Sequence, residues 1–105
     1  MVKRKKIPKM LRDYIVSRQS GKCACCLEPG CHFHHIIAFG INSENQLHHR
    51  NLILLCKKHH ILFHQGDPDT YQMVYEYAWY IQNGKLPSDT DLATISSEVY
   101  DFFNK

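Results

Sequence analysis

Long hydrophobic runs are missing from this chain of 105 residues, and acidic residues are scarce in its first 64 positions. The longest apolar run is far shorter than the roughly 20 residues that a membrane-spanning helix needs, so we expect no membrane partner. The basic N-terminus has no apolar stretch behind it, which argues against a secretory signal. The chain also lacks internal repeats, and its length leaves no room for a TIM barrel or for a dinucleotide-binding fold with a second domain.

Charge is distributed unevenly along the chain, although the net charge is only +3. Residues 1–64 contain 11 basic and 3 acidic residues, whereas residues 65–105 contain 2 basic and 7 acidic residues. The first part is therefore suited to meet an anion and the second is not. A basic run opens the chain with Lys3, Arg4, Lys5 and Lys6. This run is either a solvated terminus or an arm that neutralises phosphates.

All 8 histidines and all 5 cysteines lie between Cys23 and His64. Such a concentration of nitrogen and sulfur ligands is typical of metal-binding sequences. Because the number of cysteines is odd, the chain cannot pair all of them internally. Together with the missing secretory signal, this predicts a reducing, intracellular location, namely the cytoplasm.

Turn and cap residues divide the chain into short elements. Helical spacing predicts a helix over residues 8–19, short strands lie within 31–37 and at 52–55, and a second helix is expected over 57–65. The stretch 39–50 reads as a loop. Asp67 and Pro68 are suited to begin a helix that ends at Gly84, and Ser88 with Asp91 resembles a capping box that begins another. The apolar stripes of these last helices favour a packed core over base stacking by their tyrosines, and they leave a homodimer or another protein partner open.

Two spaced ligand pairs, Cys23-x-x-Cys26 and Cys56-x-x-His59, predict a structural zinc site. Each pair can grip one Zn²⁺, and four nitrogen and sulfur ligands complete a tetrahedron without a vacancy. Such a site would hold a small fold together. Cys25 is a poor candidate ligand, because it is too close in sequence to Cys23 and Cys26 to bind the same ion with either of them. Cys31 is an alternative ligand. The competing interpretation is that these are buried thiols with a chance spacing.

The remaining histidines predict a second, open metal site. His60 and His64 are four residues apart and share one face of the expected helix, whereas His59 points elsewhere. His34 and His35 are adjacent on a candidate strand and face opposite sides, so at most one of them should bind the same ion. Three neutral imidazoles leave positions for a phosphate oxygen and water, and they suit Zn²⁺, Ni²⁺, Co²⁺ or Mn²⁺ better than Mg²⁺. The other histidines lack joint spacing and are expected to be structural or exposed: His32, His48 and His49.

The stretch from Cys23 to His64 resembles the HNH endonuclease family, whose fold is that of the ββα-metal nucleases. The matching pieces are GKCACC at 21–26, HHII at 34–37, NLILLC at 51–56 and KKHH at 57–60. The resemblance implies an α+β fold with a small ββα-metal core and a structural zinc knuckle, preceded by one helix and followed by two C-terminal helices. We expect residues 1–66 to form this core with its basic arm, and residues 67–105 to pack on it as a helical extension within a single domain.

The resemblance also implies roles for individual residues. His35 looks like the general base, Asn51 like the residue that fixes the loop and orients the base, and His60 like a ligand of the catalytic metal. His34 stands where many members have an aspartate. The colicin-type nuclease toxins are similar to this chain in having a His-His pair there, and in a His-x-x-x-His pattern matching His60 and His64. The cysteine positions resemble the zinc-stapled branch of the family, with a histidine in place of the usual fourth cysteine.

These features predict a metal-dependent endonuclease that hydrolyses DNA phosphodiester bonds. His35 would take a proton from the attacking water, while a divalent ion on His34, His60 and His64 would bind the scissile phosphate. The resemblance implies 5′-phosphate and 3′-hydroxyl ends. The chemistry does not distinguish DNA from RNA, and the small size is compatible with a phage or mobile-element enzyme. Contacts to the nucleic-acid backbone are expected from Lys3, Arg4, Lys5, Lys6, Arg50, Lys57 and Lys58.

The alternative function is a non-catalytic, zinc-stabilised module that binds nucleic acid. Such a module needs the cysteine pairs and the basic face of the molecule. It does not need the four histidines His34, His35, His60 and His64 together with Asn51. A nuclease assay with and without a chelator separates the two functions.

Overall fold

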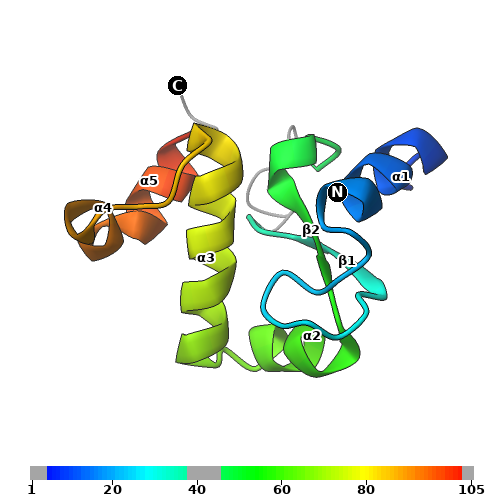
Figure 1. The fold of residues 1–105 in the computed structure, drawn as a ribbon, viewed down its shortest axis with the longest axis horizontal. Helices are drawn as coiled ribbons and strands as arrows, with labels where there is room; N and C mark the ends of the chain where they lie inside the picture. Colours follow the sequence, from blue (N-terminus) through cyan, green and yellow to red (C-terminus); the bar gives the residue numbers. More distant parts are fainter. Residues whose placement is uncertain (1–4, 38–45, 103–105) are drawn as a thin grey trace.

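The computed structural model describes residues 5–37 and 46–102, so Lys3, Arg4 and the first part of the expected loop lie outside the described residues. The order of elements is helix, strand, 3₁₀ turn, strand and helix, followed by further helices (Figure 1). Their bounds are α1 Lys9–Arg18, β1 His32–His35, η2 His49–Asn51, β2 Leu52–Leu55, α2 Lys57–His64, α3 Pro68–Asn83, α4 Asp89–Ala93 and α5 Ile95–Phe102. The expected α+β fold is therefore confirmed.

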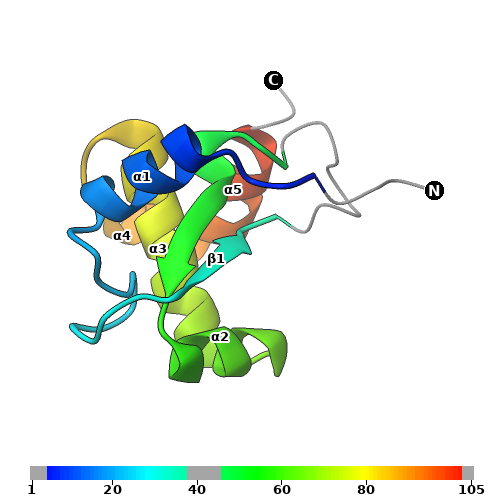
Figure 2. The same ribbon diagram turned by 90° about the vertical axis from the view of Figure 1, so that its right-hand side faces the viewer.

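The two strands form an antiparallel sheet, in which β2 is buried on both faces. His32 lies opposite Leu55 and His35 opposite Leu52. In Figure 2, α1 lies in front of β2 and α3 lies behind it, with α2 below the sheet. Leu52 and Leu54 pack against Ile15 of α1, whereas the alternate residues of β2 join the core on the side of α2 and α3. This explains why β2 is apolar at every position. Side chains alternate between the two faces of a strand, so a sheet covered on one face only would have a polar residue at every second position.

The larger core combines side chains from the two halves of the chain. The ββα part contributes Ile36, Ile53, Leu55 and Phe63, and the C-terminal helices contribute Val74, Ala78, Trp79, Ile95 and Val99. A two-stranded sheet with one short helix exposes apolar surface on its own, and α3 with α5 covers that surface. Among the described residues, no helix has both the length and the apolarity needed to cross a membrane.

The expected helix ends after Gly66 are confirmed by their capping geometry. The Asp67 carboxylate accepts a hydrogen bond from the backbone N–H of Thr70 at 2.9 Å, and α3 ends at Gly84, which has a φ of 75°. Ser88 and Asp91 form the reciprocal hydrogen bonds of a capping box at the start of α4. These short-range signals therefore place the boundaries of the C-terminal elements.

The expectation of two C-terminal helices is wrong in one respect, because the second is broken into α4 and α5 at Thr94. The backbone of Thr94 leaves helical geometry, with φ of −125° and ψ of 22°, and its N–H bonds back only to the carbonyl of Asp91. The break reorients the following turn, so that Ile95 and Val99 are buried against the core. Packing on α3 therefore overrides a hydrophobic spacing that would fit one continuous helix (Figure 1).

Candidate active site

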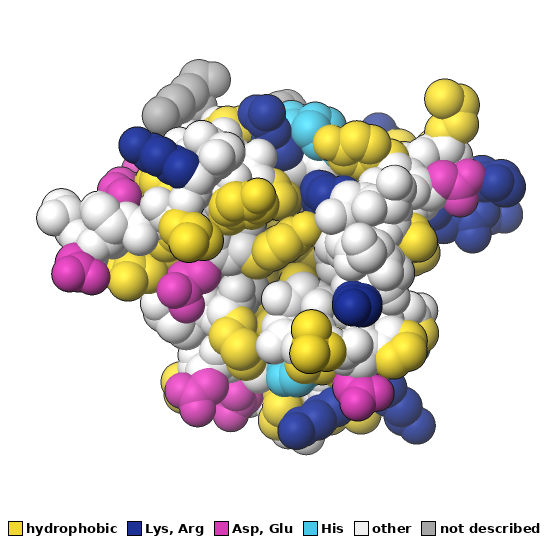
Figure 3. Space-filling model, in the orientation of Figure 1, with side chains coloured by type: hydrophobic (Ala, Val, Ile, Leu, Met, Phe, Trp, Pro, Cys, Tyr) yellow, Lys and Arg dark blue, Asp and Glu magenta, His cyan; other side chains and the backbone are white. Residues whose placement is uncertain are grey.

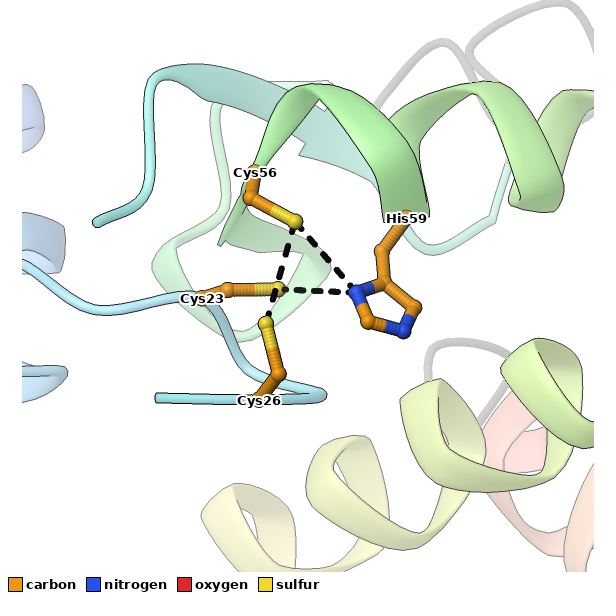
Figure 4. A group of neighbouring side chains, drawn as sticks. All are labelled: Cys23, Cys26, Cys56 and His59. Atoms are coloured by element: carbon orange, nitrogen blue, oxygen red, sulfur yellow. Dashed lines mark hydrogen bonds between the residues drawn. The ribbon is translucent and has the colours of Figure 1, made fainter. Parts of the chain in front are cut away.

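Four ligand side chains converge where the segment after α1 meets the start of α2 (Figure 4). Cys23 and Cys26 come from the segment that follows α1, Cys56 is the N-cap residue of α2, and His59 lies in the first turn of that helix. The Sγ atoms of Cys26 and Cys56 are 3.8 Å apart, and His59 Nδ1 lies 3.3 Å from Cys56 Sγ and 3.7 Å from Cys23 Sγ. All four ligand atoms lie within 4.8 Å of one another.

This geometry fits a tetrahedral zinc ion. With zinc–sulfur bonds of about 2.3 Å, two sulfur ligands of one tetrahedron stand about 3.8 Å apart. The spacing of Cys26 and Cys56 agrees with that value. The two other cysteines are not part of the cluster: Cys25 donates its backbone N–H to Cys23 Sγ, and Cys31 is exposed. The alternative ligand Cys31 is therefore not favoured by the structure.

The cysteine thiols in and beside this cluster differ in how readily they ionise. Burial raises the pKa of the Cys56 thiol, but hydrogen bonds from the backbone N–H and ring of His59 outweigh it, and the pKa falls to about 7. Burial raises the pKa of Cys26 to about 11, and burial together with the charge of Cys23 raises that of Cys25 to about 12. The Cys56 thiolate is therefore accessible near neutral pH, whereas ionisation of Cys26 requires a bound cation to offset burial.

A second cluster consists of three histidines, with His34 on β1 and His60 and His64 on α2. Their ligand nitrogens lie within 4.8 Å of one another, and the Nε2 atoms of His34 and His64 are 3.1 Å apart. His34 is buried, His60 is half-buried and His64 is exposed, so the cluster runs from the core to the surface. A group of this kind can bind an ion and still leave one side open to a substrate.

His34 is prepared to act as a neutral ligand. Burial lowers the pKa of its imidazole to about 4, and nearby His64 and His60 contribute in the same direction. Its Nδ1 lies 3.3 Å from the carbonyl oxygen of His35, which can only accept a hydrogen bond. The proton of the neutral ring therefore sits on Nδ1, which leaves the Nε2 lone pair directed at the cluster.

His35 lies on the opposite side of β1 and has a different partner. Its Nε2 is 2.9 Å from the backbone carbonyl oxygen of Gln46. Because a carbonyl only accepts, Nε2 carries the proton in the neutral ring and Nδ1 is the basic nitrogen. The side chain of Gln46 accepts a hydrogen bond from the backbone N–H of Lys5 at 2.6 Å, so the basic N-terminal segment is tied to the loop that holds His35.

Asn51 joins the two ends of the loop between the strands. It is fully buried, its Oδ1 accepts from the Ile37 N–H at 2.7 Å, and its Nδ2 donates to the Ile37 carbonyl at 3.1 Å. Asn51 also accepts the backbone N–H of Ile36 through its own carbonyl at 2.9 Å. The segment that leaves β1 after His35 is thus held against η2 by one side chain and one peptide group.

The expected basic contacts are spread over several elements. Lys57 and Lys58 are exposed on the first turn of α2, and Lys5 and Lys6 are exposed before α1. Arg50 is half-buried in η2, with its guanidinium carbon 5.5 Å from the centre of the Phe102 ring. The other two expected contacts, Lys3 and Arg4, lie outside the described residues.

Two residues near the histidines were not singled out by the sequence patterns. The ring of His32 stacks on His60, with centroids 4.4 Å apart and an angle of 19° between the planes. Alternation along a strand could have indicated this, because His32 and His34 are two residues apart and share a face. Gln46 has no comparable signal, since its contacts with His35 and Lys5 depend on the path of the loop.

Comparison with known proteins supplies a family. A family model described as HNH endonuclease matches residues 15–67, which is half of the chain and includes both clusters, His35 and Asn51. No curated protein and no solved structure gives a significant match. The sequence motifs, the ββα arrangement with its two ligand clusters and the family match agree, and the chain belongs to the HNH endonuclease family.

Proposed function

We propose that this protein is a metal-dependent endonuclease that hydrolyses phosphodiester bonds in DNA, with His35 as the general base. Membership of the HNH endonuclease family supports a nuclease. The observation that carries the finer proposal is the three-histidine cluster, whose ligand nitrogens lie within 4.8 Å of one another beside the strand position of His35. A module that only binds nucleic acid would not need that second cluster.

The donor set of His34, His60 and His64 fits a borderline divalent cation. Neutral imidazoles suit Zn²⁺, Ni²⁺, Mn²⁺ or Co²⁺, whereas Mg²⁺ prefers oxygen ligands. A divalent cation held there would act as a Lewis acid toward the scissile phosphate. The Cys23, Cys26, Cys56 and His59 cluster would hold a structural Zn²⁺, because its four ligands leave no position for a substrate.

His35 would act through its Nδ1 atom. Nδ1 takes a proton from the water that attacks phosphorus, and the hydrogen bond from Nε2 to the Gln46 carbonyl holds the ring and favours the imidazolium that forms. The bond from phosphorus to the 3′ oxygen breaks as the bond to the water oxygen forms. The 3′ oxygen then takes a proton from a water molecule and the His35 imidazolium returns its proton to solvent, so the products carry 5′-phosphate and 3′-hydroxyl ends. Asn51 would keep the loop in this geometry through its bonds to Ile37.

Basic residues on three segments would bind the DNA backbone. The exposed Lys57 and Lys58 lie at the start of the helix that bears His60 and His64. Lys5 and Lys6 lie in the segment that is tied to the His35 loop through Gln46, and Arg50 lies beside Asn51. These placements support contacts beside the histidine cluster and beside the loop of His35, and Lys3 and Arg4 would extend the N-terminal arm.

Cleavage of supercoiled plasmid DNA tests this function. The zinc-loaded wild-type protein should cleave when a divalent ion is added and should stop when the ion is chelated. We expect His35→Ala to cleave about 10²–10⁴ times more slowly, because the general base is removed. Zinc content should stay at the wild-type value, since His35 belongs to neither ligand cluster.

His48→Asn is a matched control for that experiment. It removes a histidine from the same loop, and an asparagine oxygen can still accept the backbone N–H of Arg50, as His48 does now. We expect this variant to cleave like the wild type. Wild-type cleavage by His35→Ala would contradict the role of His35, and DNA binding without any cleavage would favour the non-catalytic module. Parallel assays on single-stranded and duplex RNA would show which sugar is accepted.

A further inference from the structure

A basic pocket of about 230 Å³ lies where α1, η2 and the C-terminal end of α3 meet. None of its lining residues belongs to either ligand cluster. Figure 3 shows Lys and Arg side chains beside hydrophobic ones on the face between α1 and the upper end of α3. The main lining residues are Tyr14, Arg18, His49, Arg50, Tyr80 and Ile81. Tyr80 and Ile81 lie beyond the region that matches the family model, so the C-terminal extension completes the pocket.

Within the described residues, no carboxylate pairs with either of the two arginines of this pocket. Arg18 donates to the backbone carbonyls of His49 at 2.8 Å and Leu52 at 2.5 Å, and both acceptors are neutral. The guanidinium of Arg50 stacks on Phe102. Neither arginine has an ion pair with the described part of the chain, and no acidic side chain lines the pocket. Half-buried cations without a counter-charge create a positive potential that favours an anion.

The pKa of His49, which also lines the pocket, is shifted in the direction that a positive potential would cause. Burial lowers the pKa of His49, and the charges of His48, Arg50 and Arg18 lower it further. His49 is therefore neutral at physiological pH and adds no third charge. The exposed Tyr14 and Tyr80 stand at the opening, where a phenol can donate a hydrogen bond or a ring can pack against a sugar.

We propose that this pocket binds a backbone phosphate of the nucleic acid, at a position away from the bond that is cleaved. The proposal rests on the proposed function, because it places the pocket on the path of the substrate. Arginine forks match phosphate oxygens, which they can bind in pairs. The carbonyls that Arg18 holds belong to His49 and Leu52, which bracket Asn51 in the chain. A phosphate held by the fork of Arg50 beside the positive charge of Arg18 would thus set the register of the duplex relative to the loop of His35.

Binding of a labelled DNA duplex, measured by fluorescence anisotropy without added divalent ions, tests the pocket. Arg50→Gln should weaken binding by about 3–10-fold at moderate salt and should reduce the slope of log affinity against log salt by about 1. Lys85→Gln is the matched control, since it removes one nearby positive charge that does not line the pocket. We expect Lys85→Gln to keep the wild-type affinity and slope. Equal effects of the two variants would overturn the proposal.

A second variant keeps the test decisive if Arg50→Gln fails to fold. Arg50→Lys preserves the charge but removes the fork, so we expect the wild-type salt slope with a lower affinity; unchanged affinity would overturn the proposal. Inorganic phosphate provides the other arm. If it raises the melting temperature of the wild type but not of Arg50→Gln, while DNA binding is the same in both, the ligand is free phosphate and not the nucleic-acid backbone.

The readout separates this proposal from the nuclease proposal. Binding in the absence of divalent ions does not require cleavage, so a selective loss of DNA affinity in Arg50→Gln would support the pocket even if the wild type cleaved nothing. Conversely, cleavage by the wild type together with equal DNA binding by Arg50→Gln and Lys85→Gln would overturn the pocket and leave the nuclease intact.

Discussion

His34 and His35 are neighbours in the sequence, and the strand directs them to different tasks. His34 faces α2, where its ring contacts Phe63, His60 and His64, whereas His35 contacts the loop at Gln46. The register of β1 on β2 sets this division, because His34 pairs with Ile53 and His35 with Leu52. A shift of one residue would exchange the two faces and place the wrong imidazole at the cluster.

The low pKa of His34 leads to a pH prediction. Burial holds this pKa at about 4 in the folded protein, compared with about 6.5 for an unperturbed histidine. The unfolded chain therefore takes up the proton first as pH falls. We expect the contribution of His34 to the free energy of unfolding to be fully present above pH 6.5. This free energy should fall by about 3 kcal/mol between pH 6.5 and pH 4, as the unfolded chain takes up the proton first.

Histidine ring resonances in an NMR titration of the zinc-loaded protein would check this value. The His34→Gln variant identifies the resonance by its absence. Its melting temperature should also fall less steeply with acid than that of the wild type, because the protonation of His34 has been removed. A midpoint near 6.5 for His34 would contradict the effect of burial.

At the scale of single residues, the sequence predicted the composition of both clusters but not their surroundings. Ligand spacing is local, so Cys23-x-x-Cys26 and Cys56-x-x-His59 could be found by inspection, and the structure brings these four together. The partner of His35 is the carbonyl of Gln46, and no pattern in the sequence marks a backbone carbonyl in a loop. The roles of His35, Asn51 and the three-histidine cluster in catalysis stay predictions.

Among the elements, the sequence predicted those whose ends are marked by caps. Asp67 and Gly84 bound α3, and Ser88 begins α4, because each cap acts through hydrogen bonds within a few residues. The break at Thr94 was missed, since hydrophobic spacing from Leu92 onward fits one helix. It is set by the burial of Ile95 and Val99 against α3, which is a contact distant in sequence.

The segment between α1 and β1, which contains Gly30, packs closely against β2, and this contact gives a prediction at the scale of elements. Gly30 lies over Leu54, and a Cβ atom added at position 30 would overlap Leu54 Cγ and lie 2.6 Å from its Cδ2. Leu54 is buried between β2 and α1, so it has little room to move. We expect Gly30→Ala to destabilise the protein by about 1–3 kcal/mol, measured by denaturant unfolding of the zinc-loaded protein.

A double-mutant cycle controls for other effects of the alanine. Leu54→Ala alone should destabilise through the cavity it leaves. Combined with Gly30→Ala, it should cost less than the two separate losses together, because the overlap is removed. Strict additivity would show that the cost of Gly30→Ala comes from the backbone at position 30 and not from contact with Leu54.

At the scale of the whole molecule, the C-terminal helices have two parts in the structure: they complete the larger core, and α3 lines the pocket around Arg18 and Arg50. The apolar stripe of α3 indicated a packed helix, and its side chains do enter the larger core. The pocket around Arg18 and Arg50 was not predicted, because it needs α1, η2 and α3 to meet and no local motif records that meeting. The pocket thus combines basic residues from the first part of the chain with a surface supplied by the acidic part.

Removing the C-terminal helices should therefore unfold the protein and not merely expose its core. A chain ending at Gly66 loses Val74, Trp79, Ile95 and Val99 from the larger core. Burial of a large apolar side chain is worth about 1.5–3 kcal/mol, and the total stability of a domain is only about 5–15 kcal/mol. We expect residues 1–66 to show no cooperative thermal transition by circular dichroism even with zinc, whereas the full-length protein should show one. A cooperative transition for residues 1–66 would show that the ββα part is an independent domain, and α3 to α5 would then be an accessory to its fold.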